Sequence, residues 1–159
     1  MNDASSPFWD FSLRFYARPG IATACLDIQD QAGADVNVVL YLLFLAQQRR
    51  QLSLPEVVDL DHTAASWREQ VVRPLRTARR HLKNVAAPFA GDAASRLRDD
   101  IKRSELAAEH IQQLAIEQRY PCATVGIAAE SAAYAAGANL NAYAAHIGAL
   151  PATAVNTIL

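Results

Sequence analysis

The sequence predicts an all-α fold, a compact single domain of about five to seven helices around a buried central helix at residues 36–48. Three observations favour this. Residues 36–46 are apolar except for Asn37, which is typical of a helix surrounded by other helices. The segments on either side repeat apolar residues every three or four positions, the period of an α-helix. Capping residues, glycines and prolines divide the chain at lengths typical of helices.

The first helix is predicted from Pro7 to Tyr16. Ser6 is a suitable N-cap, and Pro7 occupies the first helical position, where proline is favoured. Pro19-Gly20 interrupts the pattern and starts a second helix. Each helix has an apolar face, made of Phe8, Phe11 and Phe15 in the first and of Ile21, Ala24, Cys25 and Ile28 in the second.

The central helix follows directly on Asp35, a good N-cap, while Gly33 closes the segment before it. Residues 47–50 give it a polar, basic end, which suits a helix C-terminus. Its apolar run is shorter than the ~20 residues that cross a bilayer, so the chain is not expected to be transmembrane.

Four oxygen-bearing side chains surround Gly33, namely Asp27, Asp30, Asp35 and Asn37. Their spacing differs from that of a calcium-binding loop. Asp27 and Asp30 are three residues apart on one helix face, an arrangement that could hold Mg²⁺ with phosphates. The favoured interpretation is that Asp35 caps the central helix, Asn37 satisfies a backbone group, and the other two carboxylates are solvated. No metal ion or cofactor is therefore expected.

Several motifs together resemble an uncharacterised family of small proteobacterial proteins of unknown function. They are FWxFSLxxYxxPG, ACLxxQDxxGxDVN followed by an apolar run, TAASWREQVVRPLRTARRHLK and SELAAEHIQQ, and they cover about residues 8–118. The resemblance implies a bacterial all-α protein. It implies no activity and no catalytic residues.

Ser53 and Glu56 form a capping box, with Pro55 in the first turn. The sequence predicts a short helix to about Leu60, and then a longer helix that Asp61 or Thr63 caps and that ends near Asn84. Pro74 lacks a backbone N–H, so it is expected to kink this second helix near Gln70.

Residues 68–83 carry six basic side chains and one acidic one. A solvated, ion-paired helix face is the favoured interpretation. The alternative is a site for a phosphate, an anionic lipid headgroup or an acidic partner. Nucleic acid is not expected, because no aromatic side chains alternate with the arginines and the net charge of the chain is −1. The candidate anion-binding residues are Arg73, Arg76, Arg79, Arg80 and Lys83.

A long helix is predicted from Asp92 to about Arg119, with a buried stripe of Leu97, Ile101, Ala108, Ile111 and Ala115. Glu105, Glu109 and His110 do not form the Glu-x-x-His pattern of a di-iron bundle, because Glu109 and His110 are adjacent and point in different directions. The sequence also lacks the glycine-rich and nucleophile-elbow motifs GxGxxG, GxxxxGK[ST] and GxSxG.

The C-terminal segment, residues 120–159, is rich in alanine and contains one charged residue, Glu130. One or two helices are predicted, at about 125–136 and 138–148, followed by a frayed end. Interface cores contain few charges. We therefore expect part of this segment to contact another chain or a groove-bound ligand, with Tyr134, Leu140 and Tyr143 as the candidate interface residues. The alternative is a loosely ordered, alanine-rich tail.

These features favour a non-catalytic helical interaction or assembly module, with a protein partner or a second copy of the chain. The alternative is a small ligand-binding domain or enzyme that uses Asp27, Asp30 and the Arg-rich helix 68–83. That plan faintly resembles the head-to-head prenyl synthases, whose DxxxD pairs hold Mg²⁺ and diphosphate. Here the Asp spacing differs and no second DxxxD is present.

The N-terminus lacks a secretory signal pattern, so a cytoplasmic location is expected. Cys25 and Cys122 fit no CxxC motif.

Overall fold

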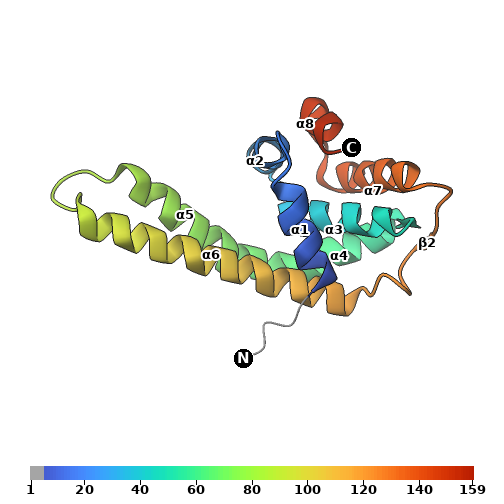
Figure 1. Cartoon of the computed structure of the whole chain (residues 1–159), viewed down its shortest axis with the longest axis horizontal. Coiled ribbons are helices and arrows are strands. Elements are labelled where there is room, and N and C mark those ends of the chain that lie inside the picture. The colour runs from blue at the N-terminus through green and yellow to red at the C-terminus, as the bar shows by residue number, and fades with distance from the viewer. Residues whose placement is uncertain (1–5) are drawn as a thin grey trace.

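The computed structural model describes residues 6–159, so residues 1–5 of the predicted domain 1–159 lie outside the described part. The predicted all-α fold is confirmed (Figure 1). Its α-helices are α1 (Pro7–Tyr16), α2 (Ile21–Ala32), α3 (Val36–Gln47), α4 (Leu54–Trp67), α5 (Arg73–His81), α6 (Asp92–Arg119), α7 (Ala132–Ile147) and α8 (Ala152–Ile158). Two short strands, β1 (Arg50–Gln51) and β2 (Ile127–Ala128), pair antiparallel. None of the described helices is long and apolar enough to cross a bilayer.

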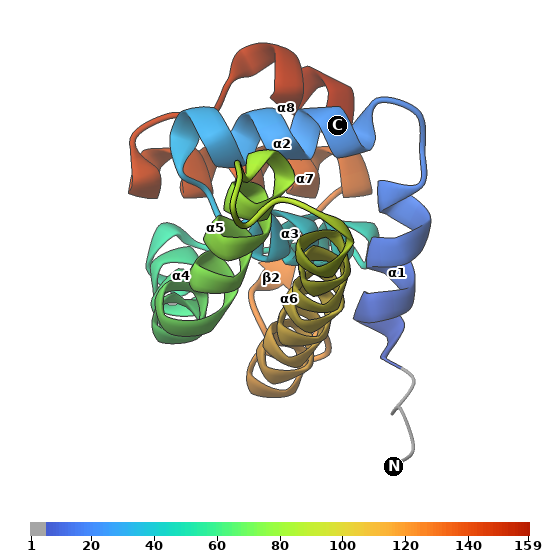
Figure 2. The same ribbon diagram turned by 90° about the vertical axis from the view of Figure 1, so that its left-hand side faces the viewer.

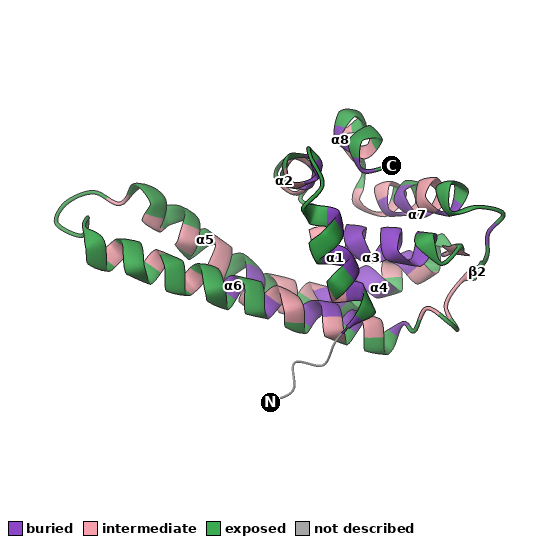
Figure 3. Cartoon of the chain, viewed as in Figure 1, coloured by how far each residue is buried: buried purple, intermediate pink, exposed green. Residues whose placement is uncertain are grey.

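Helix α3 is the centre of the core, as predicted. Every residue from Asn37 to Ala46 is buried, and Figure 3 shows this helix enclosed by α1, α4 and α7. The side chain of Asp35 caps it, because its Oδ1 accepts a hydrogen bond from the backbone N–H of Asn37 at 2.9 Å. Phe8 of α1 packs edge-on against Tyr41, with 4.7 Å between the ring centroids. The apolar run of the sequence therefore forms the core through contacts on all sides.

Helices α1 and α2 begin where the sequence predicts. Ser6 caps α1 through a hydrogen bond from the backbone N–H of Trp9 to its Oγ, 3.0 Å. Gly20 precedes α2 with a φ of 81°, a left-handed conformation that glycine adopts without strain. Helix α2 then crosses the top of the molecule beside α8 (Figure 2).

The break predicted near Leu60 is wrong. Helix α4 continues to Trp67 and passes through a π-helical segment, Arg68–Val72, into α5, so the described residues form seven α-helices when α4 and α5 are counted as one. Asp61 is a buried residue inside α4 rather than a cap. The π-helical segment lies at the predicted kink, just before Pro74, whose missing N–H leaves the carbonyl group of Gln70 without its usual partner.

Helices α5 and α6 form an antiparallel hairpin that projects from the body of the molecule, and we call this hairpin the arm (Figures 1 and 2). The apolar stripe predicted for α6 is wrong in part. Leu97 and Ile111 are each 51% exposed, and Ala115 is exposed as well. Of the predicted stripe only Ala108 is fully buried, and it lies beside polar buried residues, because this face of α6 meets polar and charged groups of α3 and α5. The buried residues of α6 are Glu105, Ala108, Gln112, Gln113 and Ile116.

The C-terminal segment is part of the core. Gly137 does not divide α7 into two helices. The packing of α7 against α3 stabilises it by more than the cost of about 1 kcal/mol that a glycine inside a helix carries. Two of the three predicted interface residues are buried. Leu140 and Tyr143 are 2% and 1% exposed and pack in this chain's own core, whereas Tyr134 is 52% exposed. The segment carries few charges because it covers α3. Helix α8 replaces the predicted frayed end.

Candidate functional site

A groove of about 990 Å³ lies where the arm meets the body of the molecule. Its walls come from α1, α2, the start of α3, the π-helical segment, α5 and α6. Four of the large apolar side chains that the structure leaves exposed line this one groove, and together we call them the apolar rim: Leu13, Tyr16, Leu26 and Leu106. The groove therefore combines an apolar rim with a polar floor built around Asp35.

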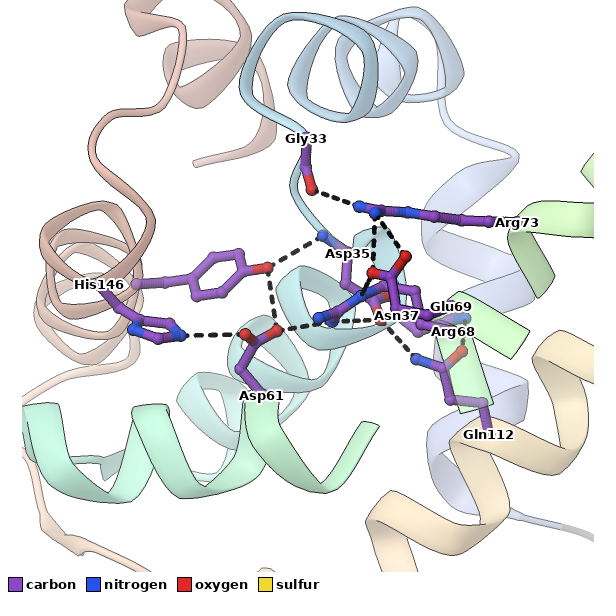
Figure 4. Close-up of polar contacts among 10 residues, drawn as sticks. Gly33, Asp35, Asn37, Asp61, Arg68, Glu69, Arg73, Gln112 and His146 are labelled. Carbon is purple, nitrogen blue, oxygen red and sulfur yellow. Dashed lines mark hydrogen bonds and ion pairs between the residues drawn. The ribbon is translucent and has the colours of Figure 1, made fainter. Parts of the chain in front are cut away.

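Asp35 is at the centre of the floor (Figure 4). While its Oδ1 caps α3, its Oδ2 accepts hydrogen bonds from Arg68 Nη1 at 3.1 Å and from Gln112 Nε2 at 2.6 Å. The side chain is 5% exposed. One carboxylate thus terminates a helix and also binds a cation and an amide from two other elements.

Arg68 joins two buried carboxylates. Its Nη1 also donates to Asp61 Oδ1 at 2.7 Å, and the Arg68 side chain is 14% exposed. Burial alone would lower the pKa of this guanidinium, but Asp35 and Asp61 outweigh burial and raise it above its usual value. Arg68 is therefore a fixed positive charge between two aspartates.

The network extends from Asp61 to the C-terminal segment (Figure 4). His146 Nε2 lies 3.0 Å from Asp61 Oδ2, and the hydroxyl oxygen of Tyr143 accepts the backbone N–H of Asp35 at 2.9 Å. Burial raises the pKa of the Tyr143 hydroxyl, so it remains protonated. Helix α7 is thereby tied to the same polar centre as α3 and α4.

Amides connect α6 to the body of the molecule. Gln113 Nε2 donates to Asn37 Oδ1 at 2.8 Å, and Ser12 Oγ donates to Gln113 Oε1 at 3.0 Å. Asn37 Nδ2 in turn donates to Gln112 Oε1 at 3.3 Å. Buried polar groups need hydrogen-bond partners, and these amides supply them to one another. The face of α6 toward the core can therefore carry glutamines rather than leucines.

The arm contributes a second cluster to the groove, built on buried Glu105. Arg76 Nε donates to Glu105 Oε1 at 2.9 Å, and Arg79 binds the other oxygen of the same carboxylate. Arg76 Nη2 also donates to Glu109 Oε1 at 2.8 Å. Burial tends to raise the pKa of Glu105, but hydrogen bonds from Arg79 and Arg76 outweigh it and lower that pKa. At Glu109 burial dominates and raises the pKa.

These opposite shifts predict opposite effects of pH. Glu105 stabilises the fold above its unfolded pKa of about 4.3, and the contribution is lost as pH falls through its lower folded pKa. We expect Glu105→Gln to cost about 2 kcal/mol of unfolding free energy at neutral pH, because charged hydrogen bonds are lost, and the cost to disappear in acid. Glu109 stabilises below about pH 4.3 and loses this contribution as pH rises through its raised folded pKa.

Glu109→Gln is accordingly expected to raise stability at neutral pH and to have no such effect in acid. Urea unfolding of both variants and the wild type, at neutral pH and at pH values below about 4, measures the two curves. The two glutamines are matched controls for each other, since they lie one turn apart on α6. Parallel pH dependence of the two variants would contradict the assignment of opposite shifts.

The anion-binding candidates differ in their burial and in their ion-pair partners. Arg76 and Arg79 are mostly buried against Glu105, Arg73 pairs with Glu69 at 2.7 Å, and Arg80 pairs with Asp30 at 3.0 Å. Lys83 lies outside the groove lining. The favoured interpretation of residues 68–83 as an ion-paired face is right about the pairing, but at Arg76 and Arg79 it is wrong about solvation.

The acidic candidates do not form one cluster. Asp35 and Asn37 lie on the buried floor, Asp30 lies on the groove wall beside Arg80, and Asp27 is not part of the lining. In the part of the chain that the structure describes, no group of three or more His, Cys, Asp or Glu residues is arranged to hold a metal ion. Cys25 and Cys122 are both free thiols.

Sequence reasoning missed the residues that organise the floor. Arg68 belongs to the basic segment 68–83 but is not among the predicted anion-binding residues. Asp61 is predicted, as an alternative to Thr63, to cap a helix, and no role is predicted for Gln112. One signal was available, because Asp61 and Arg68 are seven residues apart and lie on one face of a helix that does not break between them. The contacts with Asp35 and Gln112 have no local signature.

Comparison with known proteins gives a family without an assigned activity. Residues 7–116 match the model of a family described as a protein of unknown function, DUF2390. The chain belongs to this family. No curated protein and no solved structure matches it. All lining residues of the groove lie between Trp9 and Gln113, so the DUF2390 match contains the whole groove, whereas α7 and α8 follow it. The expected relation to an uncharacterised family is thereby confirmed.

Proposed function

We propose that this DUF2390 protein is a non-catalytic interaction module whose groove binds an amphipathic helix of a partner protein, with acidic residues on the polar side of that helix. The observation that carries the proposal is the apolar rim around a groove with charged walls. A cytoplasmic setting is proposed with it, since the two free thiols suit a reducing compartment.

The apolar rim supports a helical occupant. Leu13, Tyr16, Leu26 and Leu106 are between 39% and 51% exposed, and they come from three helices that face a common space. Scattered exposed leucines are ordinary, but apolar side chains gathered around a groove mark binding sites. An amphipathic helix presents apolar residues at i, i+3, i+4 and i+7, which matches a rim contributed by several helices.

The charge of the groove favours acidic residues on the partner helix. The groove lining contains seven lysines and arginines and five aspartates and glutamates, whereas the chain as a whole carries −1. Two of the lining arginines, Arg73 and Arg103, pair with Glu69 and Asp100 outside the lining, but both pairs are exposed and therefore weak, so an acidic partner could replace these carboxylates. Such complementarity chiefly sets specificity and the rate of association. Glutamates beside the leucines of a partner helix would then face the arginines of α5.

The proposal is tested by selecting binders from a library of helical peptides on the immobilised full chain. We expect winners to have apolar residues at helical spacing together with Asp or Glu. Their affinity should fall at least tenfold for the double variant Leu26→Ser, Leu106→Ser, because a buried leucine contributes about 1.5–3 kcal/mol. Ile127→Ser is the matched control, since Ile127 is 66% exposed and lies outside the groove.

The alternative of a small phosphorylated or anionic ligand has one supporting feature, the convergence of Arg76 and Arg79 on a single carboxylate. It ranks second because these guanidinium groups are already neutralised by Glu105 and because Asp27 does not line the groove. Selected peptides that bind the groove variant as well as the wild type would overturn the helix proposal. Thermal stabilisation by Mg²⁺ and pyrophosphate, lost in the Arg79→Gln variant, would favour the alternative instead.

A further inference from the structure

The tip of the arm has an unusual composition for an exposed loop. Residues 85–90, Val-Ala-Ala-Pro-Phe-Ala, contain no polar side chain. Phe89 is 75% exposed, more than any other large apolar residue in the described part of the chain. Loops at such positions are normally built from polar residues together with glycine and proline.

The tip lies far from anything that could cover it. Figures 1 and 3 show it at the far end of the arm, with exposed residues on both flanking helices. Of the six loop residues only Val85 is partly buried. A single exposed apolar side chain needs no explanation, but six consecutive apolar residues at a protruding end indicate a contact surface.

Charge is distributed unevenly between the outer part of the arm, residues 79–103, and the rest of the chain. Residues 79–103 contain seven basic and three acidic residues, a net charge of +4. The remaining eight basic and thirteen acidic residues give −5. Lys83 and Arg96 flank the loop on either side, and both are exposed. Between them lies one acidic residue, Asp92, which is also exposed, so basic side chains outnumber acidic ones around the apolar tip, on an otherwise negative protein.

We propose that the tip of the arm binds the surface of a bilayer that contains anionic lipids, with Phe89 inserted below the headgroups and Lys83 and Arg96 in contact with them. This inference is independent of the groove. A bilayer offers a negative surface with an apolar layer directly beneath it, and the tip presents the complementary order of charge and apolar residues. A nucleic acid offers the negative charge, but its bases would have to accept one phenyl ring without further aromatic neighbours in the loop.

Binding through one loop is expected to be weak, reversible and sensitive to salt. Each basic residue near an anionic surface contributes about fivefold in affinity, so Lys83→Gln with Arg96→Gln should weaken binding about 25-fold. Phe89→Ser should weaken it about tenfold or more, because a buried phenyl ring contributes at least that much.

The test is co-sedimentation of the full chain with vesicles of phosphatidylcholine alone or mixed with phosphatidylglycerol. We expect binding only to the mixed vesicles, loss of binding in both variants, and unchanged binding for Ile127→Ser. Ile127 is exposed and belongs to β2, which lies at the opposite end of the molecule from the tip (Figure 1). Brominated lipid should quench the tryptophan fluorescence of a Phe89→Trp variant more than that of the wild type. The two native tryptophans, Trp9 in α1 and Trp67 at the end of α4, lie away from the tip.

Three results would overturn the inference. They are the absence of binding to the mixed vesicles, equal binding to neutral vesicles, and Phe89→Ser binding as tightly as the wild type. Binding of a single-stranded or double-stranded oligonucleotide that depends on Phe89, without vesicle binding, would assign the tip to nucleic acid instead. Because none of these variants alters the apolar rim, failure here leaves the result of the peptide selection unaffected.

Discussion

Replacing Arg68 by alanine is expected to lower the unfolding free energy by about 3–5 kcal/mol, because it leaves buried charges without their partner. Asp35 and Asp61 both bind Nη1 of this guanidinium, and their side chains are 5% and 9% exposed. Arg73→Ala is the matched control, since its ion pair with Glu69 is more than 40% exposed at both ends and should contribute about 0–1 kcal/mol. Urea unfolding at neutral pH measures both variants.

A double variant distinguishes the cost of the unpaired buried charge from the cost of lost packing. If uncompensated charge dominates, adding Asp61→Asn to Arg68→Ala should recover part of the stability, even though two native side chains are then missing. Additive losses in the double variant would show that the ion pair is not the reason. A cost for Arg68→Ala no greater than for Arg73→Ala would contradict the central role of Arg68.

Removing residues 124–159 is expected to prevent folding of the remaining chain. Leu140 and Tyr143 cover α3. Buried Asn139 donates to the carbonyl groups of Leu42 in α3 and Arg50 in β1, and it accepts the backbone N–H of Leu52 just after β1. Without this cover, a helix of ten consecutive buried residues faces water. We expect the truncated chain to aggregate and to show no cooperative thermal unfolding by circular dichroism.

The control for the truncation is Tyr134→Ser, which changes an exposed residue of the same helix and should alter stability by less than about 0.5 kcal/mol. A truncated chain that remains monomeric by light scattering and unfolds cooperatively would refute the assignment of α7 to the core.

Local signals were sufficient for much of the fold. Caps at Ser6 and Asp35 and the break at Pro19-Gly20 mark helix ends that depend only on nearby residues, and the structure has these helices where the sequence predicts them. Prediction failed where one residue type serves two purposes. Asp61 has the chemistry of a cap but is an ion-pair partner, and Gly137 resembles a break but lies within a well-packed helix.

The candidate site was less predictable than the fold. Its floor joins Asp35 to Arg68 and Gln112, which are 33 and 77 positions away in the sequence. A buried glutamine and a solvated one look alike in a helical pattern, because burial of polar groups depends on partners that only the tertiary structure supplies. The groove itself is defined by the angle at which the arm leaves the body, and no periodicity encodes that angle.

The packing of α3 against α7 also has a kinetic consequence. Their contacts join residues about one hundred positions apart, such as Leu42 and Asn139. Contacts of this range slow folding, since a long loop must close before they contribute stability. During synthesis α3 emerges well before α7, so the most apolar helix remains without its final cover while most of the chain is still being made. The nascent protein is therefore expected to depend on chaperones that hold apolar segments, more than a helical protein with mainly local contacts would.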